Sequence, residues 1–494
     1  MDNIERTVRK LLQDPWASRL VLAFTVGMFL SCSAAVAASQ SVLDRTLRPV
    51  SAAPKPARLP EIRLRTLSNG MRVAVLEDHE IPAVQVSAVV EIPSALDPLG
   101  KEGVAGFTRS MLTEGTTTRS AEALVDAFAD LGSSVSPFGF YTITRNLDSA
   151  LALMAEQLMN PAFPQAALDR ITANAVTGLR RQKEQPNYIA SRIFSNVVFG
   201  ASHPYTRTTT EASIASITRD DLAAFHQQYY RPQNISLVIV GDITVDRAVA
   251  HAEKAFARWQ QVGPKATIDI SAPAGPSATT IYLHDRPGSP QSFVVAGHLG
   301  PRRDAPEYFA LSLVNTALGG GFNSRLNLNL REQHHFTYGA GSTYTYRPVP
   351  QVGVFTASAS VQTEKTDSAL VEMMSEIRGI LGARPVTSTE LAFAKSGITK
   401  GLPLSFETVP QIAGGVATIL TDRLPLDYHA TLSGRVDAVT IEDAMAAGRR
   451  YLHPDRMAII VVGDRRTIEA KLRASGLAPI VIVDDQGKPV IDGR

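Results

Sequence analysis

The chain has 494 residues, of which 44% are hydrophobic and 19% are charged, and its formal net charge is +2. This composition is typical of folded globular domains and excludes a largely disordered chain. The small net charge gives no bulk electrostatic reason to expect binding to nucleic acid. At about 150 residues per domain, the length predicts three units or two large ones.

The first 37 residues have the pattern of a secretory signal peptide. Basic residues precede the apolar run Leu20–Leu30, and small residues at 35–37 offer a cleavage site. Export of this kind predicts a periplasmic protein. Two alternatives remain open, namely an uncleaved membrane anchor over residues 20–37 and a lipid attached to Cys32. Cys32 is the only cysteine, so the mature chain is expected to contain no disulfide.

Composition divides the rest of the chain into two predicted domains. Residues 38–60 are rich in Ala and Pro and predict a tether, and the similar stretch 266–280 predicts a linker. The domains are therefore expected at 61–265 and 281–494.

Apolar periodicity then places strands and helices in chain order. Two apolar strands at 71–78 and 84–92 flank a short segment and predict a hairpin-like pair. A strand at 291–299 occupies the matching place in the second half. Apolar residues at spacings of three and four predict helices at 120–131, 147–159 and 165–184. Strands followed by helices, twice over, predict an α+β fold of two homologous halves, each an antiparallel sheet with helices packed on one face.

The two halves end in the same pattern of residues. Residues 217–242 and 439–464 match without a gap, each as an N-capped helix, a proline break, a buried strand and a turn. The matched positions lie 222 residues apart in three pairs, Thr218 and Thr440, Pro232 and Pro454, and Asp242 and Asp464. A repeat of this length indicates a duplicated domain.

Six short segments carry a resemblance to a known family. They are LSNGMRVAVLED (67–78), GVAGFTRSMLTEGT (103–116), LMNPAF (158–163), HPY (203–205), YYRPQNISLVIVGD (229–242) and LREQHHFTYGAGS (330–342). Together, in this order, they resemble the pitrilysin/insulinase family of zinc peptidases, in its shorter processing-peptidase-like branch. The resemblance implies two halves of processing-peptidase type.

The residues that hold zinc in that family are missing here. The family carries His-x-x-Glu-His on its first helix, where two His bind zinc and Glu activates water. Residues three and four apart share one helix face, and that face here carries Gly106, Arg109 and Ser110. The family's third ligand, a Glu on a later helix, falls at Thr177 or Gly178. A catalytic zinc site needs three protein ligands, so we expect no metal and no catalytic residue in this chain.

A second set of residues matches a different role in the family. Some members work as pairs, in which the subunit without zinc supplies an Arg and a Tyr to the substrate backbone. Arg331 and Tyr338 stand at the matching positions, and both groups can donate hydrogen bonds to peptide carbonyls. In such relatives a glycine-rich loop touches substrate, and Gly319, Gly320 and Gly321 match that loop here. The alternatives are a helix cap for the glycines, a favourable helix-dipole contact for the Arg, and core packing for the Tyr.

The resemblance therefore implies a non-catalytic subunit of a periplasmic, insulinase-type zinc metalloendopeptidase. Its partner would be a zinc-bearing homologue, and the pair would act on peptides. In relatives the region corresponding to residues 133–147 supplies the sheet edge on which substrate lies, and here it is shorter. Two alternatives stay open, a peptide-binding homodimer without peptidase activity and an enzyme with an unrecognised site. Membrane contact is expected only through an uncleaved signal.

Overall fold

The computed structural model describes residues 60–261, 263–268, 270–347 and 351–490. The predicted signal peptide and Cys32 lie outside these residues, as does all of the predicted tether except Pro60. None of the helices in the described part of the chain is long and apolar enough to cross a membrane.

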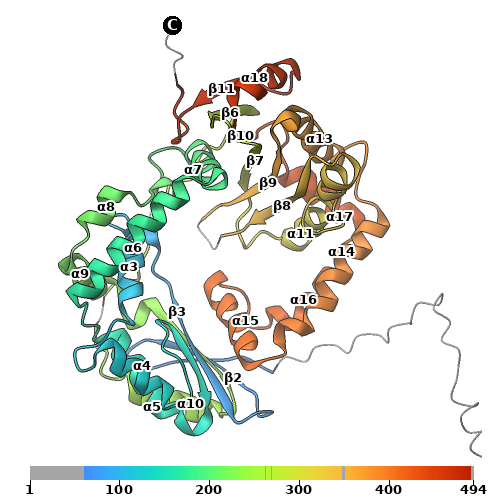
Figure 1. Cartoon of the computed structure of the whole chain (residues 1–494). Helices are drawn as coiled ribbons and strands as arrows, with labels where there is room; N and C mark the ends of the chain where they lie inside the picture. The colour runs from blue at the N-terminus through green and yellow to red at the C-terminus, as the bar shows by residue number, and fades with distance from the viewer. Residues whose placement is uncertain (1–59, 262, 269, 348–350, 491–494) are drawn as a thin grey trace, which may run out of the picture. The chain divides into compact units, whose positions relative to one another are not determined.

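The first half contains a five-stranded sheet with the order β1-β2-β5-β3-β4 (Figure 1). Its strands are β1 (Arg63–Thr66), β2 (Arg72–Glu77), β3 (Ala83–Val90), β4 (Gly139–Ile143) and β5 (Ile235–Gly241). β2 and β5 run parallel, whereas the other neighbours run antiparallel. The predicted antiparallel pairing is therefore confirmed for three of the four neighbouring pairs, and the parallel pair of β2 with β5 is the exception. The predicted hairpin of β2 with β3 is wrong, because β5 lies between them.

The end of β5 and the start of β3 approach each other closely. The Asp242 N–H donates to the Ala83 carbonyl oxygen over 3.0 Å, where the chain enters β3. A Cβ atom on Gly241 would lie 2.1 Å from the same oxygen, and the φ angle of Gly241 is +136°. Gly463 occupies the equivalent place in the second half, where a Cβ atom would lie 2.3 Å from Ser292 Oγ. The Gly-Asp turn of each repeat is thus required by strand packing.

The second half contains a six-stranded sheet with the order β11-β6-β10-β7-β9-β8. Its strands are β6 (Thr280–Asp285), β7 (Gln291–Gly300), β8 (Thr337–Thr345), β9 (Gly353–Gln362), β10 (Ala458–Gly463) and β11 (Ile480–Val483). β6 runs parallel to β10 and β11, and the remaining neighbours are antiparallel. This sheet is therefore mixed as well, because β10 lies between β6 and β7 as β5 lies between β2 and β3.

Helices surround both sheets. In the first half they are α3 (Val104–Met111), α4 (Ala121–Ala129), α5 (Leu147–Met159), α6 (Gln165–Lys183), α7 (Pro186–Phe199), α8 (Glu211–Ser216), α9 (Arg219–Tyr229) and α10 (Val245–Phe256). In the second half they are α11 (Tyr308–Leu318), α12 (Arg325–Asn327), the π-helix η5 (Leu328–Gln333), α13 (Thr366–Gly379), α14 (Ser388–Gly401), α15 (Val409–Asp422), α16 (Tyr428–Asp437), α17 (Ile441–Tyr451) and α18 (Arg465–Ala474). The three helices predicted in the first half are confirmed as α4, α5 and α6.

The predicted repeat is confirmed. The helices α9 and α17 are offset by 222 residues at both ends, and β5 and β10 end 222 residues apart. Both helices begin with a capping box, in which the Thr218 and Thr440 side chains accept from the backbone N–H three residues later. The strand β8 has no counterpart in the first half, because residues 133–138, which precede β4, form no strand. The first half thus lacks an edge strand that the second half has.

Each sheet is covered on its second face by a helix from the other half (Figure 1). α15 packs on β3 and β5, and α7 packs on β7 and β10. On β5, Leu237 and Ile239 face the helices of the first half, while Val238 and Val240 join the cluster that contains Val416 of α15. The predicted packing of each half's own helices on one face of its sheet is confirmed, and the second face, which is also apolar, is covered by the helix from the other half.

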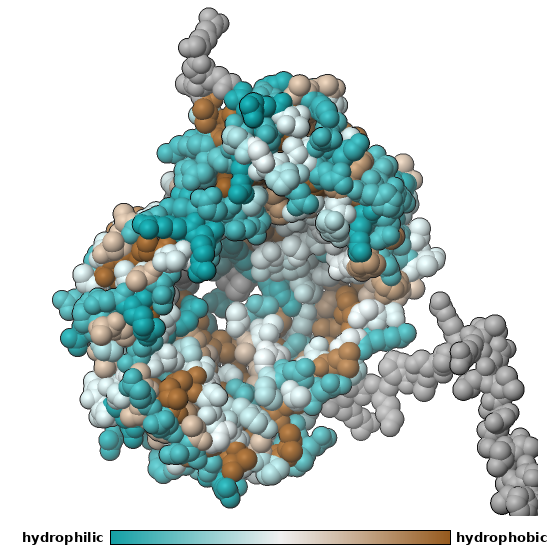
Figure 2. Space-filling model, viewed as in Figure 1, coloured by the Kyte–Doolittle hydropathy of each residue, from teal (hydrophilic) through white to brown (hydrophobic). Residues whose placement is uncertain are grey.

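The outer helices are amphipathic. On α18, Ile468 and Leu472 are buried, whereas Arg466 and Arg473 are exposed. Figure 2 shows hydrophilic residues covering the region of α13 and α18 in the upper part of the view. The apolar stripe of such a helix faces the core and its polar stripe faces water.

Replacing Leu420 by Ala removes a buried side chain that α15 packs on the sheet of the first half. We expect a loss of about 2–5 kcal/mol in the free energy of unfolding, because the transfer and cavity terms add. Thr418→Ala is the matched control, since Thr418 is exposed on the same helix. Urea unfolding and limited proteolysis of the first half would measure the effect. Equal unfolding midpoints for the two variants would show that α15 does not stabilise that sheet.

Candidate functional site

The helix α3, which carries the zinc motif in the resembling family, is fixed by an apolar stripe and by one carboxylate. The buried stripe consists of Val104, Phe107 and Met111. The Asp97 carboxylate accepts hydrogen bonds of 2.7 Å from the backbone N–H groups of Gly103 and Ala105. Burial raises the pKa of Asp97. Asp97 could not be predicted from the sequence, because it lies several residues before the helix and outside the usual N-cap spacing.

The other face of α3 is exposed and carries Gly106, Arg109 and Ser110, as predicted. The Ser110 hydroxyl donates to the Gly106 carbonyl oxygen over 3.1 Å. The Arg109 guanidinium lies over the Phe138 ring, 5.8 Å from its centroid. The local contacts of this face are thus made within the helix or to an aromatic ring.

These residues do not fit a zinc ion. Glycine offers no side chain, a guanidinium stays protonated, and a hydroxyl is a poor ligand beside Cys, His and carboxylates. On α6, which contacts α3, the Thr177 hydroxyl donates to the Ala173 carbonyl oxygen over 2.9 Å, and Gly178 follows it. Among the described residues, no group of three or more His, Cys, Asp or Glu side chains could hold a metal ion.

The second set of predicted residues meets in one groove of about 640 Å³. The loop after α11, the π-helix η5 and the strand β8 form its walls. All five predicted positions line it, namely Gly319, Gly320, Gly321, Arg331 and Tyr338. The tertiary structure thus brings together residues that the family resemblance had singled out.

Tyr338 projects from a β-bulge. Thr337 pairs with Val361 and Ala340 pairs with Ala359, so β8 contains one more residue than β9 between these two pairs. The Thr337 hydroxyl donates to the Ser360 carbonyl oxygen over 2.6 Å and holds the bulge in place. Tyr338 is 90% exposed and therefore does not belong to the core. Regular alternation along β8 would place Tyr338 on the same face as the buried Tyr344, and the bulge changes its direction.

Arg331 lies on the π-helix η5. Only the single turn α12 is α-helical in this segment before the π-helix begins. Such π-segments frequently occur at functional sites. The Arg331 guanidinium lies 4.6 Å from the Phe322 ring centroid, and its Nε atom lies 3.3 Å from Glu332 Oε1. Arg331 is thus held at the groove by one aromatic ring and one carboxylate.

The three glycines of the loop differ in the space around them. A Cβ atom on Gly319 would lie 2.3 Å from the Ser342 backbone nitrogen, and one on Gly320 would lie 2.9 Å from Thr316 Cα. A Cβ atom on Gly321 would meet nothing within 4 Å. Gly319 and Gly320 are therefore required by close packing. Gly321 is the position with open space in front of it.

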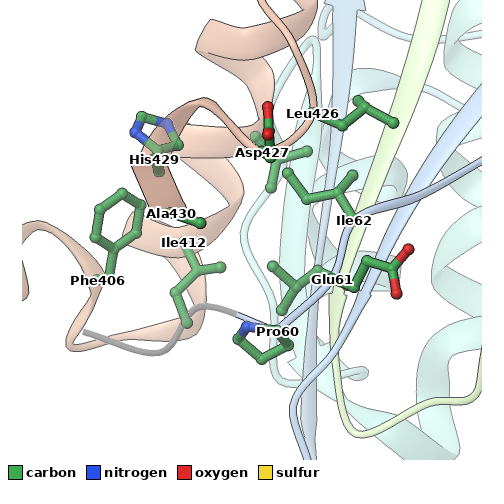
Figure 3. Close-up of a pocket in the computed structure, with 11 residues that line it drawn as sticks. Pro60, Glu61, Ile62, Phe406, Ile412, Leu426, Asp427, His429 and Ala430 are labelled. Carbon is green, nitrogen blue, oxygen red and sulfur yellow. The ribbon is translucent and has the colours of Figure 1, made fainter. Parts of the chain in front are cut away.

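A second cavity, of about 290 Å³, lies where α15 and α16 meet the first sheet (Figure 3). Its lining includes Ile62, Leu76, Phe406 and Val416 and is mainly apolar. Burial lowers the pKa of His429, another lining residue. This cavity contains none of the predicted site residues, and it belongs to the packing of α15.

Substituting Gly319 and Gly321 separately tests this packing. We expect Gly319→Ala to cost about 1–3 kcal/mol of folding free energy, because the added methyl group overlaps the β8 backbone. Gly321→Ala should stay within about 0.5 kcal/mol of the unsubstituted protein. Chemical unfolding of both variants measures the difference. Equal losses would contradict the arrangement of loop and strand described above.

Comparison with known proteins assigns most of the chain to one protein family. The insulinase (peptidase family M16) model matches residues 72–200, and the peptidase M16 inactive domain model matches residues 216–398. An uncharacterised zinc protease of Mycobacterium leprae is 25% identical over 448 residues, which cover 85% of this chain and 96% of that protein. An uncharacterised zinc protease of Rickettsia bellii is 24% identical over 354 residues, which cover 69% of this chain and 83% of that protein.

Solved structures agree with this placement. The peptidase M16 inactive domain from Pseudomonas fluorescens is 28% identical, with a TM-score of 0.73, over 82% of this chain and 98% of that chain. The periplasmic protease PqqL from Escherichia coli has a TM-score of 0.69 at 19% identity, over 86% of this chain and 49% of that chain, and supports the fold alone. The duplicated α+β fold and the two matching family models show that this chain belongs to the insulinase (peptidase M16) family.

Proposed function

We propose that the chain is a non-catalytic subunit of a periplasmic, insulinase-type zinc metalloendopeptidase. One observation carries the proposal. The exposed face of α3 offers no zinc ligand, whereas Arg331 and Tyr338 share an open groove in the other half. A zinc-bearing homologue would supply the metal, and this chain would supply donors to the peptide.

The groove is chemically suited to a peptide backbone. Tyr338 is almost fully exposed, so its hydroxyl can donate to a carbonyl without leaving a packed position. Arg331 rests on Phe322 and keeps 37% of its side chain exposed. A guanidinium placed in this way presents several N–H donors in a fixed plane. Both groups recognise carbonyl oxygens, which every peptide carries.

A predicted export signal supports the proposed periplasmic location. The pattern of residues 1–37 predicts a signal peptide. The structurally similar Escherichia coli protein PqqL is described as a periplasmic protease.

The purified chain should contain no stoichiometric zinc and should cleave no peptide. The reason is the donor set Gly106, Arg109 and Ser110 on α3. Elemental analysis and a peptide-cleavage assay, each with and without a chelator, provide the measurement. One tightly bound zinc ion per chain together with chelator-sensitive cleavage would contradict the proposal.

Arg331→Ala and Tyr338→Phe should slow a reconstituted pair without preventing its assembly. A lost hydrogen bond from a charged donor lowers kcat/KM roughly tenfold to a hundredfold, and one from a neutral donor lowers it roughly fivefold. Arg466→Ala is the control, because Arg466 is exposed on α18 and lies outside the groove. The assay uses a flexible peptide and the zinc-bearing homologue from the same organism. Normal assembly of both variants together with cleavage at the rate of the unsubstituted pair would show that these residues play no part in catalysis.

Native mass spectrometry of the co-expressed chains tests the pairing itself. We expect a complex of one copy of each homologue. A stable dimer of this chain alone, with peptide binding and no effect on the homologue's activity, would replace the proposal by a peptide-binding homodimer.

A further inference from the structure

A pocket lies beside α3 and includes one position of the family's zinc motif, Arg109. It has a volume of about 230 Å³ and is lined by two polar residues, Arg109 and Tyr230. The rest of its wall is apolar and consists of Val90, Ile92, Ala105, Phe138 and Phe225. The pocket therefore places two hydrogen-bond donors in an apolar wall.

The polar side chains of this pocket have no hydrogen-bond partner within the described part of the chain. The Arg109 guanidinium makes no hydrogen bond or ion pair to a described residue, and it lies over the Phe138 ring and close enough to Tyr230 to interact with it electrostatically. The Tyr230 ring is buried and stacks on His226 at 4.8 Å between centroids. Its hydroxyl likewise makes no hydrogen bond to a described residue. Burial raises the pKa of Tyr230, so the phenol stays protonated and can donate.

The carboxylates of the neighbouring segments are already engaged. Asp97 caps α3 through two backbone N–H groups. The others form ion pairs, which are Glu91 with Lys265, Glu102 with Arg207, and Glu114 with Arg170. The positive charge of Arg109 is therefore left without a protein counter-ion in the described residues.

We propose that this pocket binds a carboxylate of a peptide ligand. The guanidinium of Arg109 and the hydroxyl of Tyr230 both donate hydrogen bonds, and a carboxylate accepts several. The apolar wall excludes water and thereby strengthens the charge interaction. The carboxylate can come from a peptide C-terminus or from a Glu or Asp side chain. This site is independent of the proposed pairing, because the chain alone should show it.

Binding of synthetic peptides to the full mature chain tests the site. The probes share one fluorescent Ala/Ser sequence and differ in one group. The first has a central Glu and an amidated C-terminus, the second has Gln in place of Glu, and the third is the Gln peptide with a free C-terminal carboxylate. We expect the Gln amide to bind roughly tenfold more weakly than at least one of the acidic peptides. The peptide that keeps its affinity identifies the source of the carboxylate.

Variants assign the difference to this pocket. Arg109→Gln should remove the roughly tenfold preference for the acidic peptide, and Tyr230→Phe should reduce this preference roughly fivefold. Arg180→Gln is the matched control, since Arg180 is an exposed Arg on α6 that pairs with Glu211 outside the pocket. Arg109→Glu should reverse the preference and favour a peptide with a central Lys. Circular dichroism would confirm that each variant is folded.

Two results would overturn the proposal. One is equal affinity of the unsubstituted chain for the acidic and the neutral peptides. The other is a preference for the acidic peptides that survives in Arg109→Gln and Arg109→Glu. Neither result depends on a zinc-bearing partner, so failure here would be distinct from failure of the proposed pairing.

Discussion

The burial of apolar side chains on both faces of the central strands β5 and β10 is the interaction on which the rest of this structure depends. On β5, Val238 and Val240 contact α15, and on β10, Ile460 and Val462 contact α7. Each helix comes from the half opposite to the sheet that it covers. Burial of apolar surface stabilises by roughly 25 cal/mol per Å², so each half supplies a part of the other's core.

This arrangement separates the stability of the fold from the chemistry of its sites. The helix α3 is held by Val104, Phe107 and Met111 on one face and by the Asp97 carboxylate at its start. The face that would carry zinc ligands contributes nothing to these contacts. A substitution on that face therefore leaves the scaffold intact. This is the physical reason why a chain of this family can keep the fold without the metal.

The groove of the second half, in contrast to the face of α3, is built on irregular backbone. Its two prominent side chains lie at departures from regular structure, Tyr338 on a β-bulge and Arg331 on a π-helix. Gly319 brings the loop within contact of Ser342 and so connects the loop to β8. Irregular backbone places these side chains at the groove instead of in the core or along a helix face. The site therefore depends on local geometry that periodic patterns do not encode.

The duplication, three helices of the first half and the face of α3 with Gly106, Arg109 and Ser110 could be predicted from the amino-acid sequence. These features follow from local periodicity, capping residues and an ungapped repeat, which a linear pattern contains. The insertion of β5 between β2 and β3 and the packing of α7 and α15 on the opposite sheets became visible only in the folded chain. The same holds for the outward direction of Tyr338 at the bulge and for the pocket that Arg109 and Tyr230 share. The physical reason is that all of these depend on contacts between residues far apart in the chain, where apolar surfaces find partners by shape and not by sequence order.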